Sequence, residues 1–154
     1  MTVELLDISE IRRDAKLQIR AAFDRDSIDA YADAIESDVE LPPIDVFRDN
    51  EDRIYLADGW HRLLAHIQRR MEKVRCRVHS GDYRDALLHA LGANAEHGLR
   101  RTRADKRRAV ETMLEDAEWG KWSSTRIAEA CRVTQRFAAG VIEEWAKSHT
   151  VSET

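Results

Sequence analysis

The chain has 154 residues, of which 43% are hydrophobic and 35% are charged, and its formal net charge at pH 7 is −4. No apolar stretch approaches the roughly 20 residues that a membrane-spanning helix needs, and the first residues do not have the pattern of a secretory signal, so we expect a cytoplasmic protein. The charge is uneven: residues 1–60 hold 7 Lys and Arg against 16 Asp and Glu, whereas residues 61–154 hold 18 against 13. The basic second part therefore keeps nucleic-acid binding open.

Hydrophobic periodicity predicts mixed strands and helices over the first 91 residues. The segment 8–22 is mixed and predicts no clear element, and Pro42-Pro43 ends the first helix and starts an extended segment. The expected elements are an edge strand at 3–6, a helix over 27–37, hairpin strands at 44–47 and 53–57, a helix over 60–70, a strand at 74–78 and a helix over 83–91.

After Gly92 the pattern predicts helices only. A helix is expected over 102–116, and Ser123 and Thr134 are typical N-cap residues for two further helices. We therefore expect an α+β domain over 1–95, a helical region over 96–148 and a tail over 149–154. Cys76 and Cys131 are far apart and lack metal-ligand spacing, so we interpret them as reduced core residues.

The segment Asp58-Gly59-Trp60-His61-Arg62 is the most informative motif in the chain. An apolar strand precedes it and a helix is predicted to begin within it. The first turn of a helix offers unpaired backbone N–H groups and the positive end of the helix dipole, and glycine lets an anion approach closely. The motif therefore indicates a phosphate site, with a solvated turn as the alternative.

A strongly basic segment follows the expected domain boundary. Residues 99–108 contain six Arg or Lys and one Asp, and the preceding loop contributes Asn94 and His97. Amide, imidazole and guanidinium donors together suit a triphosphate. The alternative interpretation is a solvated basic helix face.

Residues 123–145 predict two short helices with a tight connection, which is the pattern of a helix-turn-helix. Thr134, Gln135 and Arg136 would then begin the recognition helix. Arg132 stands where a turn glycine is usual, and the acidic pair Glu143-Glu144 would repel phosphate. A helical hairpin that only packs remains the alternative.

With these motifs in order, the chain resembles the ParB/sulfiredoxin-like superfamily over about residues 3–145, in the arrangement of a ParB-type N-terminal domain followed by a helix-turn-helix. Gln18-Ile19-Arg20 resembles the Gln-Pro-Arg element of the family, and Pro43-Ile44-Asp45-Val46 resembles its Pro-Ile-x-Val strand. Residues 58–62 resemble its phosphate motif, and residues 94–101 resemble its second motif, Glu-Asn-x-x-Arg.

The resemblance implies a small mixed sheet with helices that binds CTP or ATP with Mg²⁺, and a DNA-binding helical region. It implies that Asn94 helps to hold the metal and that Arg100 or Arg101 acts as a clamp. The nucleotide-binding residues expected from the resemblance and the motifs are Gln18, Arg20, Asp58, Gly59, His61, Arg62, Asn94, His97, Arg100 and Arg101. The expected DNA-binding residues are Arg103, Arg107, Arg108, Arg132, Thr134, Gln135 and Arg136.

Departures from the family pattern narrow this expectation. Trp60 occupies the position of the sulfiredoxin cysteine, so sulfinic-acid reduction is not expected. Ala93 stands where partition proteins carry the Glu that is linked to hydrolysis, which argues against efficient nucleotide turnover but leaves a weak NTPase open. The short chain after the helix-turn-helix also argues against a C-terminal dimerisation domain, although a homodimer remains open.

Three functions follow as hypotheses. The first is a DNA-binding regulatory or accessory protein with a nucleotide switch. The second is a ParB-like nuclease or NTPase whose polar centre would be His61, Asp58, Asn94 and His97. The third is a ligand-free protein-interaction module on the same fold.

Overall fold

The computed structural model describes residues 1–19, 23–93 and 100–150, and these form two compact units. The N-terminal unit comprises residues 1–18 and 23–90, and the C-terminal unit comprises residues 19, 91–93 and 100–150. None of the described helices is both long enough and apolar enough to cross a membrane.

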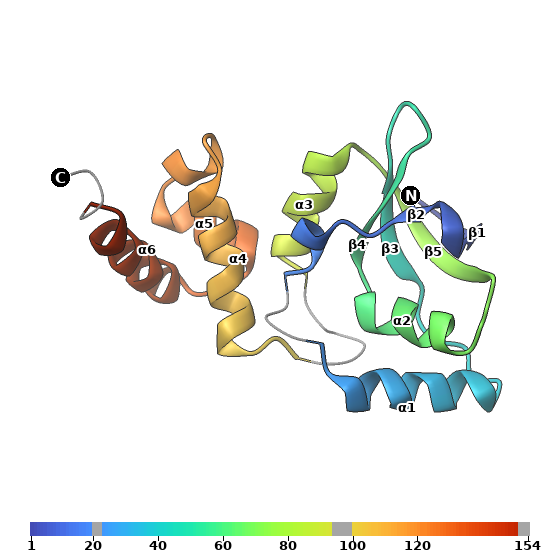
Figure 1. The fold of residues 1–154 in the computed structure, drawn as a ribbon. Coiled ribbons are helices and arrows are strands. Elements are labelled where there is room, and N and C mark those ends of the chain that lie inside the picture. The colour runs from blue at the N-terminus through green and yellow to red at the C-terminus, as the bar shows by residue number, and fades with distance from the viewer. Residues whose placement is uncertain (20–22, 94–99, 151–154) are drawn as a thin grey trace. The chain divides into compact units, whose positions relative to one another are not determined.

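A five-stranded mixed sheet forms the centre of the N-terminal unit (Figure 1). Its strand order is β1-β5-β3-β4-β2, with β3 and β4 antiparallel and β3 and β5 parallel. The predicted edge strand, hairpin and final strand are confirmed. The strands are β1 (Thr2–Asp7), β2 (Ile11–Arg12), β3 (Ile44–Arg48), β4 (Ile54–Asp58) and β5 (Lys73–Ser80).

Two short 3-10 helices and β2 occupy the segment for which the sequence predicted no element. The 3-10 helices are η1 (Ile8–Glu10) and η2 (Ala15–Leu17), and β2 pairs with β4 in parallel. A strand of two residues is too short for a periodic pattern to reveal, so its pairing partner and not its own sequence defines it.

Three helices accompany the sheet: α1 (Arg25–Glu36), α2 (Trp60–Gln68) and α3 (Tyr83–Leu91). α2 lies between α1 and the sheet (Figure 1), with Leu63 in the core of the sheet and Ala65 against Ala32 of α1. α1 begins two residues earlier than predicted, because the carboxylate of Asp24 accepts the N–H of Asp26 at 3.2 Å. α2 ends two residues before the predicted Arg70, and the predicted bounds of α3 are confirmed.

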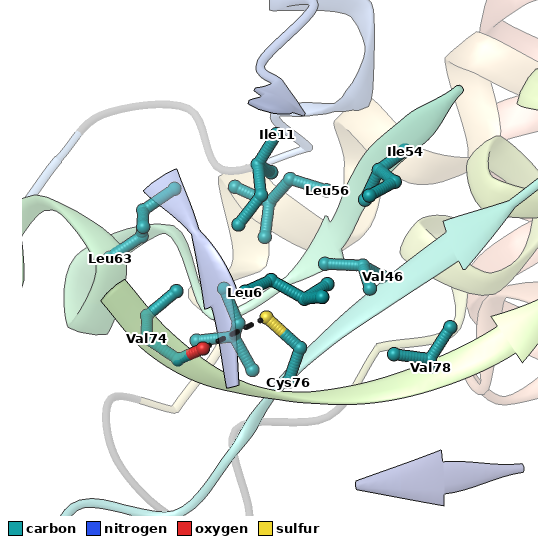
Figure 2. Close-up of a cluster of buried hydrophobic side chains, with 10 residues drawn as sticks. Leu6, Ile11, Val46, Ile54, Leu56, Leu63, Val74, Cys76 and Val78 are labelled. Carbon is teal, nitrogen blue, oxygen red and sulfur yellow. Dashed lines mark hydrogen bonds between the residues drawn. The ribbon is translucent and has the colours of Figure 1, made fainter. Parts of the chain in front are cut away.

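The core of the N-terminal unit lies on the α2 side of the sheet, where aliphatic side chains from β1 to β5 interdigitate (Figure 2). Burial alternates along β5, with Val74, Cys76 and Val78 inward, as the sequence predicted. Cys76 is fully buried, and its thiol lies 3.5 Å from the carbonyl oxygen of Val74. Burial raises its pKa to about 12.

The C-terminal unit consists of α4 (Arg103–Glu115), η3 (Trp119–Lys121), α5 (Ser124–Cys131) and α6 (Gln135–Thr150). Thr102 and Asp105 form a capping box at the start of α4, and Ser123 caps α5. Fully buried side chains join the helices, among them Val110, Met113, Ile127, Cys131 and Ala138. These caps and apolar stripes match the predicted helices.

Both thiols should be inert in the folded protein. Cys131 is fully buried, and burial raises its pKa to about 12, as for Cys76. Because the thiolate is the reactive species and forms only near its raised pKa, neither cysteine should react with a disulfide reagent at pH 8 within minutes. Ellman's reagent should count no thiols in the native protein and two in 6 M guanidinium chloride. Rapid titration of a native thiol would contradict this burial.

Candidate functional site

Gly59 forms the turn between β4 and α2. It adopts the left-handed conformation, with φ 104° and ψ 28°, and its carbonyl accepts the N–H of Leu63 at 2.9 Å. A Cβ atom at this position would lie 2.6 Å from Cγ2 of Ile44, so a side chain meets both backbone strain and a clash. The first-turn amides of α2 after Gly59 have no intrahelical acceptor, as the phosphate-site prediction requires.

The Arg62 side chain is directed into the protein. The residue is only 8% exposed, and its guanidinium donates to the carbonyl oxygens of Pro42 at 2.9 Å and Pro43 at 2.7 Å. The carboxylate of Asp58 lies 3.9 Å away. Arg62 therefore links the first turn of α2 to the segment that precedes β3. Direct contact between Arg62 and a phosphate stays a prediction.

His61 joins the first turn of α2 to the start of α1. Its imidazole is buried, and Nε2 accepts the backbone N–H of Asp24 at 3.0 Å. Phe23 lies with its ring 5.7 Å from that of His61 and 6.0 Å from that of Trp60. Any ligand that moves this turn would therefore act on the beginning of α1.

Asp58 and Trp60 flank the glycine. Burial raises the pKa of the Asp58 carboxyl above its ordinary value, and the charge of Arg62 opposes that shift. Trp60 packs against the core of the sheet, and among the described residues its buried Nε1 has no hydrogen-bond partner. The indole therefore fills space beside the core.

The other predicted nucleotide residues are distributed differently. Gln18 follows η2 and is half-buried, and Arg20, Asn94 and His97 lie outside the described residues. Arg100 and Arg101 belong to the C-terminal unit, so their position at the Gly59 turn stays a prediction.

Arg101 acts inside the C-terminal unit. Its guanidinium donates to the carbonyl oxygens of Leu91 at 3.2 Å, Cys131 at 2.9 Å and Arg132 at 3.1 Å. It thus satisfies carbonyls at the end of α5 and holds the beginning of the unit against them. Arg100, by contrast, is exposed.

The connection between α5 and α6 presents several of the predicted DNA-binding residues. Arg132 adopts the left-handed conformation, with φ 53°, and takes the place that a glycine usually fills. Thr134 accepts the N–H of Phe137 at 3.1 Å, and Gln135 donates to the hydroxyl of Ser124 at 3.0 Å. Arg132, Thr134, Gln135 and Arg136 are all exposed.

A groove of about 440 Å³ lies between α4 and α6. The guanidinium of Arg103 lies 5.3 Å from the ring centre of Phe137, and both residues line the groove. Arg107 forms ion pairs with Glu144 at 2.5 Å and with Glu111 at 3.5 Å, so two carboxylates neutralise it. Arg108 is exposed on the same helix. The remaining lining residues are Thr134, Arg136, Gly140, Val141 and Glu144.

A cluster to which the sequence assigned no role lies in the N-terminal unit. Asp45, His79 and His89 bring a carboxylate and two imidazoles within 4.8 Å of one another. The three residues are far apart in sequence, and only the parallel pairing of β3 with β5 and the position of α3 bring them together. The strand predicted from the sequence, 74–78, ended before His79, so nothing in the sequence pattern indicated that these residues would meet.

The comparisons with known proteins agree with this fold. The family model described as the ParB N-terminal domain matches residues 1–95. No curated protein matches the chain.

Three solved structures share the fold. The C-terminally truncated chromosome-partitioning protein ParB from Caulobacter crescentus complexed to the centromeric parS site is 16% identical with a TM-score of 0.62, covering 97% of this chain and 78% of that one. The same protein complexed with CTP-gamma-S is 16% identical with a TM-score of 0.53, and the match covers 99% of this chain and 86% of that one. A Pnob8-like ParB-N domain is 14% identical with a TM-score of 0.54, covering 83% and 46%. The predicted fold class, a small mixed sheet with helices followed by a helical region, is confirmed.

Proposed function

Because the chain belongs to the ParB N-terminal domain family, we propose that it is a DNA-binding regulatory or accessory protein in which a bound nucleoside triphosphate acts as a switch. The observation that supports this best is the left-handed Gly59 at the start of α2, where unpaired amides and the positive end of the helix dipole coincide. The neighbour complexed with CTP-gamma-S favours CTP over ATP as the ligand, with Mg²⁺.

The phosphates are proposed to bind the backbone amides of residues 60–62. In this proposal the Arg62 guanidinium positions the turn by donating to the carbonyl oxygens of Pro42 and Pro43, so these oxygens are not available to the ligand. Gln18 and Arg20 would line the pocket, and Asn94 would help to hold Mg²⁺. Because Arg101 already donates hydrogen bonds to three carbonyl oxygens, Arg100 is the better candidate for the residue that contacts the phosphates as a clamp.

The proposed switch acts through His61. Its ring lies in the first turn of α2 and accepts the N–H of Asp24 at the N-cap of α1. A phosphate that accepts hydrogen bonds from the backbone amides of this turn would shift the imidazole of His61 and so change the start of α1. Nucleotide occupancy would thereby alter the N-terminal unit at a point away from the phosphates themselves.

DNA binding is assigned to the C-terminal unit. We propose that α5 and α6 form a helix-turn-helix in which Gln135 and Arg136 meet base edges, because residues at the start of a recognition helix do so. Arg103, Arg108 and Arg132 would contact phosphates, which positions the protein without reading sequence. The ParB neighbour complexed to parS supports this assignment.

Calorimetric titration of CTP, ATP and GTP in the presence of Mg²⁺ tests the pocket. We expect CTP to bind, and Arg100→Ala to weaken it at least tenfold, because one charge-assisted phosphate contact is lost. The control is Lys147→Ala, since this lysine is exposed on α6 and forms an ion pair with Glu143 of the same helix at 3.5 Å. Absence of heat with all three nucleotides would refute the nucleotide switch. Bound CTP should also change the affinity for duplex DNA in fluorescence anisotropy.

A further inference from the structure

A polar cluster on the sheet face opposite the aliphatic core combines three potential metal ligands. Asp45 lies on β3 and His79 on β5, and because Asp45 pairs with Arg77 and Phe47 with His79 in parallel register, their side chains share one face. His89 comes from α3. Three separate elements therefore converge, and Nε2 of His79 lies 2.9 Å from Oδ1 of Asp45.

Burial makes the carboxylate a strong ligand candidate. Asp45 is only 6% exposed, and a buried carboxylate needs a cation or several donors nearby. Its present partners are His79 and the guanidinium of Arg77, which lies at the long distance of 3.4 Å and is 35% exposed. Arg77 can therefore turn into solvent and leave its place to a smaller, doubly charged ion.

Aromatic packing fixes the imidazoles. The ring of Phe47 stacks on His79 at 4.9 Å and meets His89 edge-on at 5.4 Å, and the two imidazoles lie 5.2 Å apart. Packed rings lose little further entropy when they bind a metal, and such outer-shell contacts hold ligands in orientation. Both histidines remain partly exposed, so an ion can enter.

We propose that Asp45, His79 and His89 form a binding site for a divalent transition-metal ion of the zinc class. Two imidazoles and one carboxylate suit Zn²⁺, Co²⁺ or Fe²⁺, whereas Mg²⁺ and Ca²⁺ prefer oxygen ligands alone. Tetrahedral coordination at about 2.1 Å places ligand atoms about 3.4 Å apart. The ligand atoms lie within 4.8 Å of one another, so they would have to move closer together by at most about 1.4 Å to reach this geometry. A fourth position would remain open to water or a further ligand.

Titration with Co²⁺ tests the site, because four- or five-coordinate Co²⁺ gives visible d–d absorption. The full chain, purified without a histidine tag, should develop these bands at one equivalent, and Zn²⁺ should remove them. His79→Ala and His89→Ala should each weaken Co²⁺ binding at least tenfold. Asp45→Asn, which keeps the side-chain shape, should do the same.

His66→Ala is the matched control. His66 is half-buried in the same unit, but its Nδ1 lies 2.7 Å from the carbonyl oxygen of Arg62 and it is not part of the cluster. Circular dichroism of each variant separates loss of a ligand from loss of the fold. Absence of visible bands in the wild-type protein at 1 mM Co²⁺ would overturn the proposal, as would equal Co²⁺ affinity in folded His79→Ala and His89→Ala. Neither result depends on nucleotide or DNA binding.

Discussion

Arg62→Ala should destabilise the N-terminal unit by about 3 kcal/mol, because removal of a buried charged donor leaves its acceptors without partners. The carbonyl oxygens of Pro42 and Pro43 now receive the guanidinium at 2.9 and 2.7 Å, and Asp58 would lose its nearby cation. Urea unfolding followed by far-ultraviolet circular dichroism measures the change. The raised pKa of Asp58 should rise further in this variant, since the opposing charge has gone.

Arg69→Ala provides the matched comparison for this loss. Arg69 caps the other end of α2 and donates to the carbonyl oxygen of Ala32 at 2.9 Å, but its side chain is 31% exposed. Its ion pairs with Asp33 and Glu36 are solvated, so the expected cost is about 1 kcal/mol. Equal losses of stability in the two variants would contradict the interpretation that the buried Arg62 guanidinium holds this part of the fold together.

This distinction also affects the nucleotide experiment. If Arg62→Ala unfolds the turn, loss of CTP binding in that variant says little about direct phosphate contact. Arg62→Lys retains the charge but not the two-pronged donor geometry, so it should fold with an intermediate loss of stability. Arg100 is the sharper probe of the proposed clamp, because its side chain is exposed whereas Arg62 is buried.

Local pattern was sufficient for most elements of the fold. The hairpin of β3 and β4 followed from two apolar runs around a polar turn, and Thr134 capped α6 as its residue type predicted. These features depend on neighbours in sequence. β2 escaped prediction because its two residues are defined only by their pairing with β4.

The candidate sites were less predictable, because a side chain's direction depends on distant residues. The motif at residues 58–62 indicated an anion-binding turn, and Gly59 adopts a left-handed conformation there, but anion binding itself stays a prediction. The sequence could not show that Arg62 would face the Pro42 and Pro43 carbonyls, since those acceptors are some twenty residues away. For the same reason, the cluster around Asp45 appears only when the β3–β5 register is known.

Arg132 illustrates an intermediate case. Glycine is the usual residue at its position in a helix-turn-helix, and this sequence has arginine there instead. The residue adopts the left-handed conformation all the same, and its carbonyl receives the guanidinium of Arg101 at 3.1 Å. A contact from outside the turn thus helps to hold the strained backbone that local sequence disfavours.

Replacing Arg103 and Arg136 together by alanine should weaken binding to duplex DNA at least tenfold at 100 mM salt. Both residues are exposed and line the groove between α4 and α6, so each is available for a phosphate or base contact. If both lie on phosphates, the slope of log affinity against log salt should fall by about 2. Fluorescence anisotropy with a labelled duplex at several salt concentrations gives both quantities.

Two neighbouring substitutions make this test specific to the groove. Arg107→Ala should have a much smaller effect, because Glu111 and Glu144 already neutralise that guanidinium. Glu144→Gln should have the opposite effect and tighten DNA binding several-fold, since it removes an anion from the groove and releases Arg107. The opposite outcome would be that replacing Arg103 and Arg136 leaves DNA affinity unchanged while Arg107→Ala abolishes DNA binding. In that case Arg107 would have to break its ion pairs with Glu111 and Glu144 when it binds DNA. The interface would then centre on α4 and not on the start of α6.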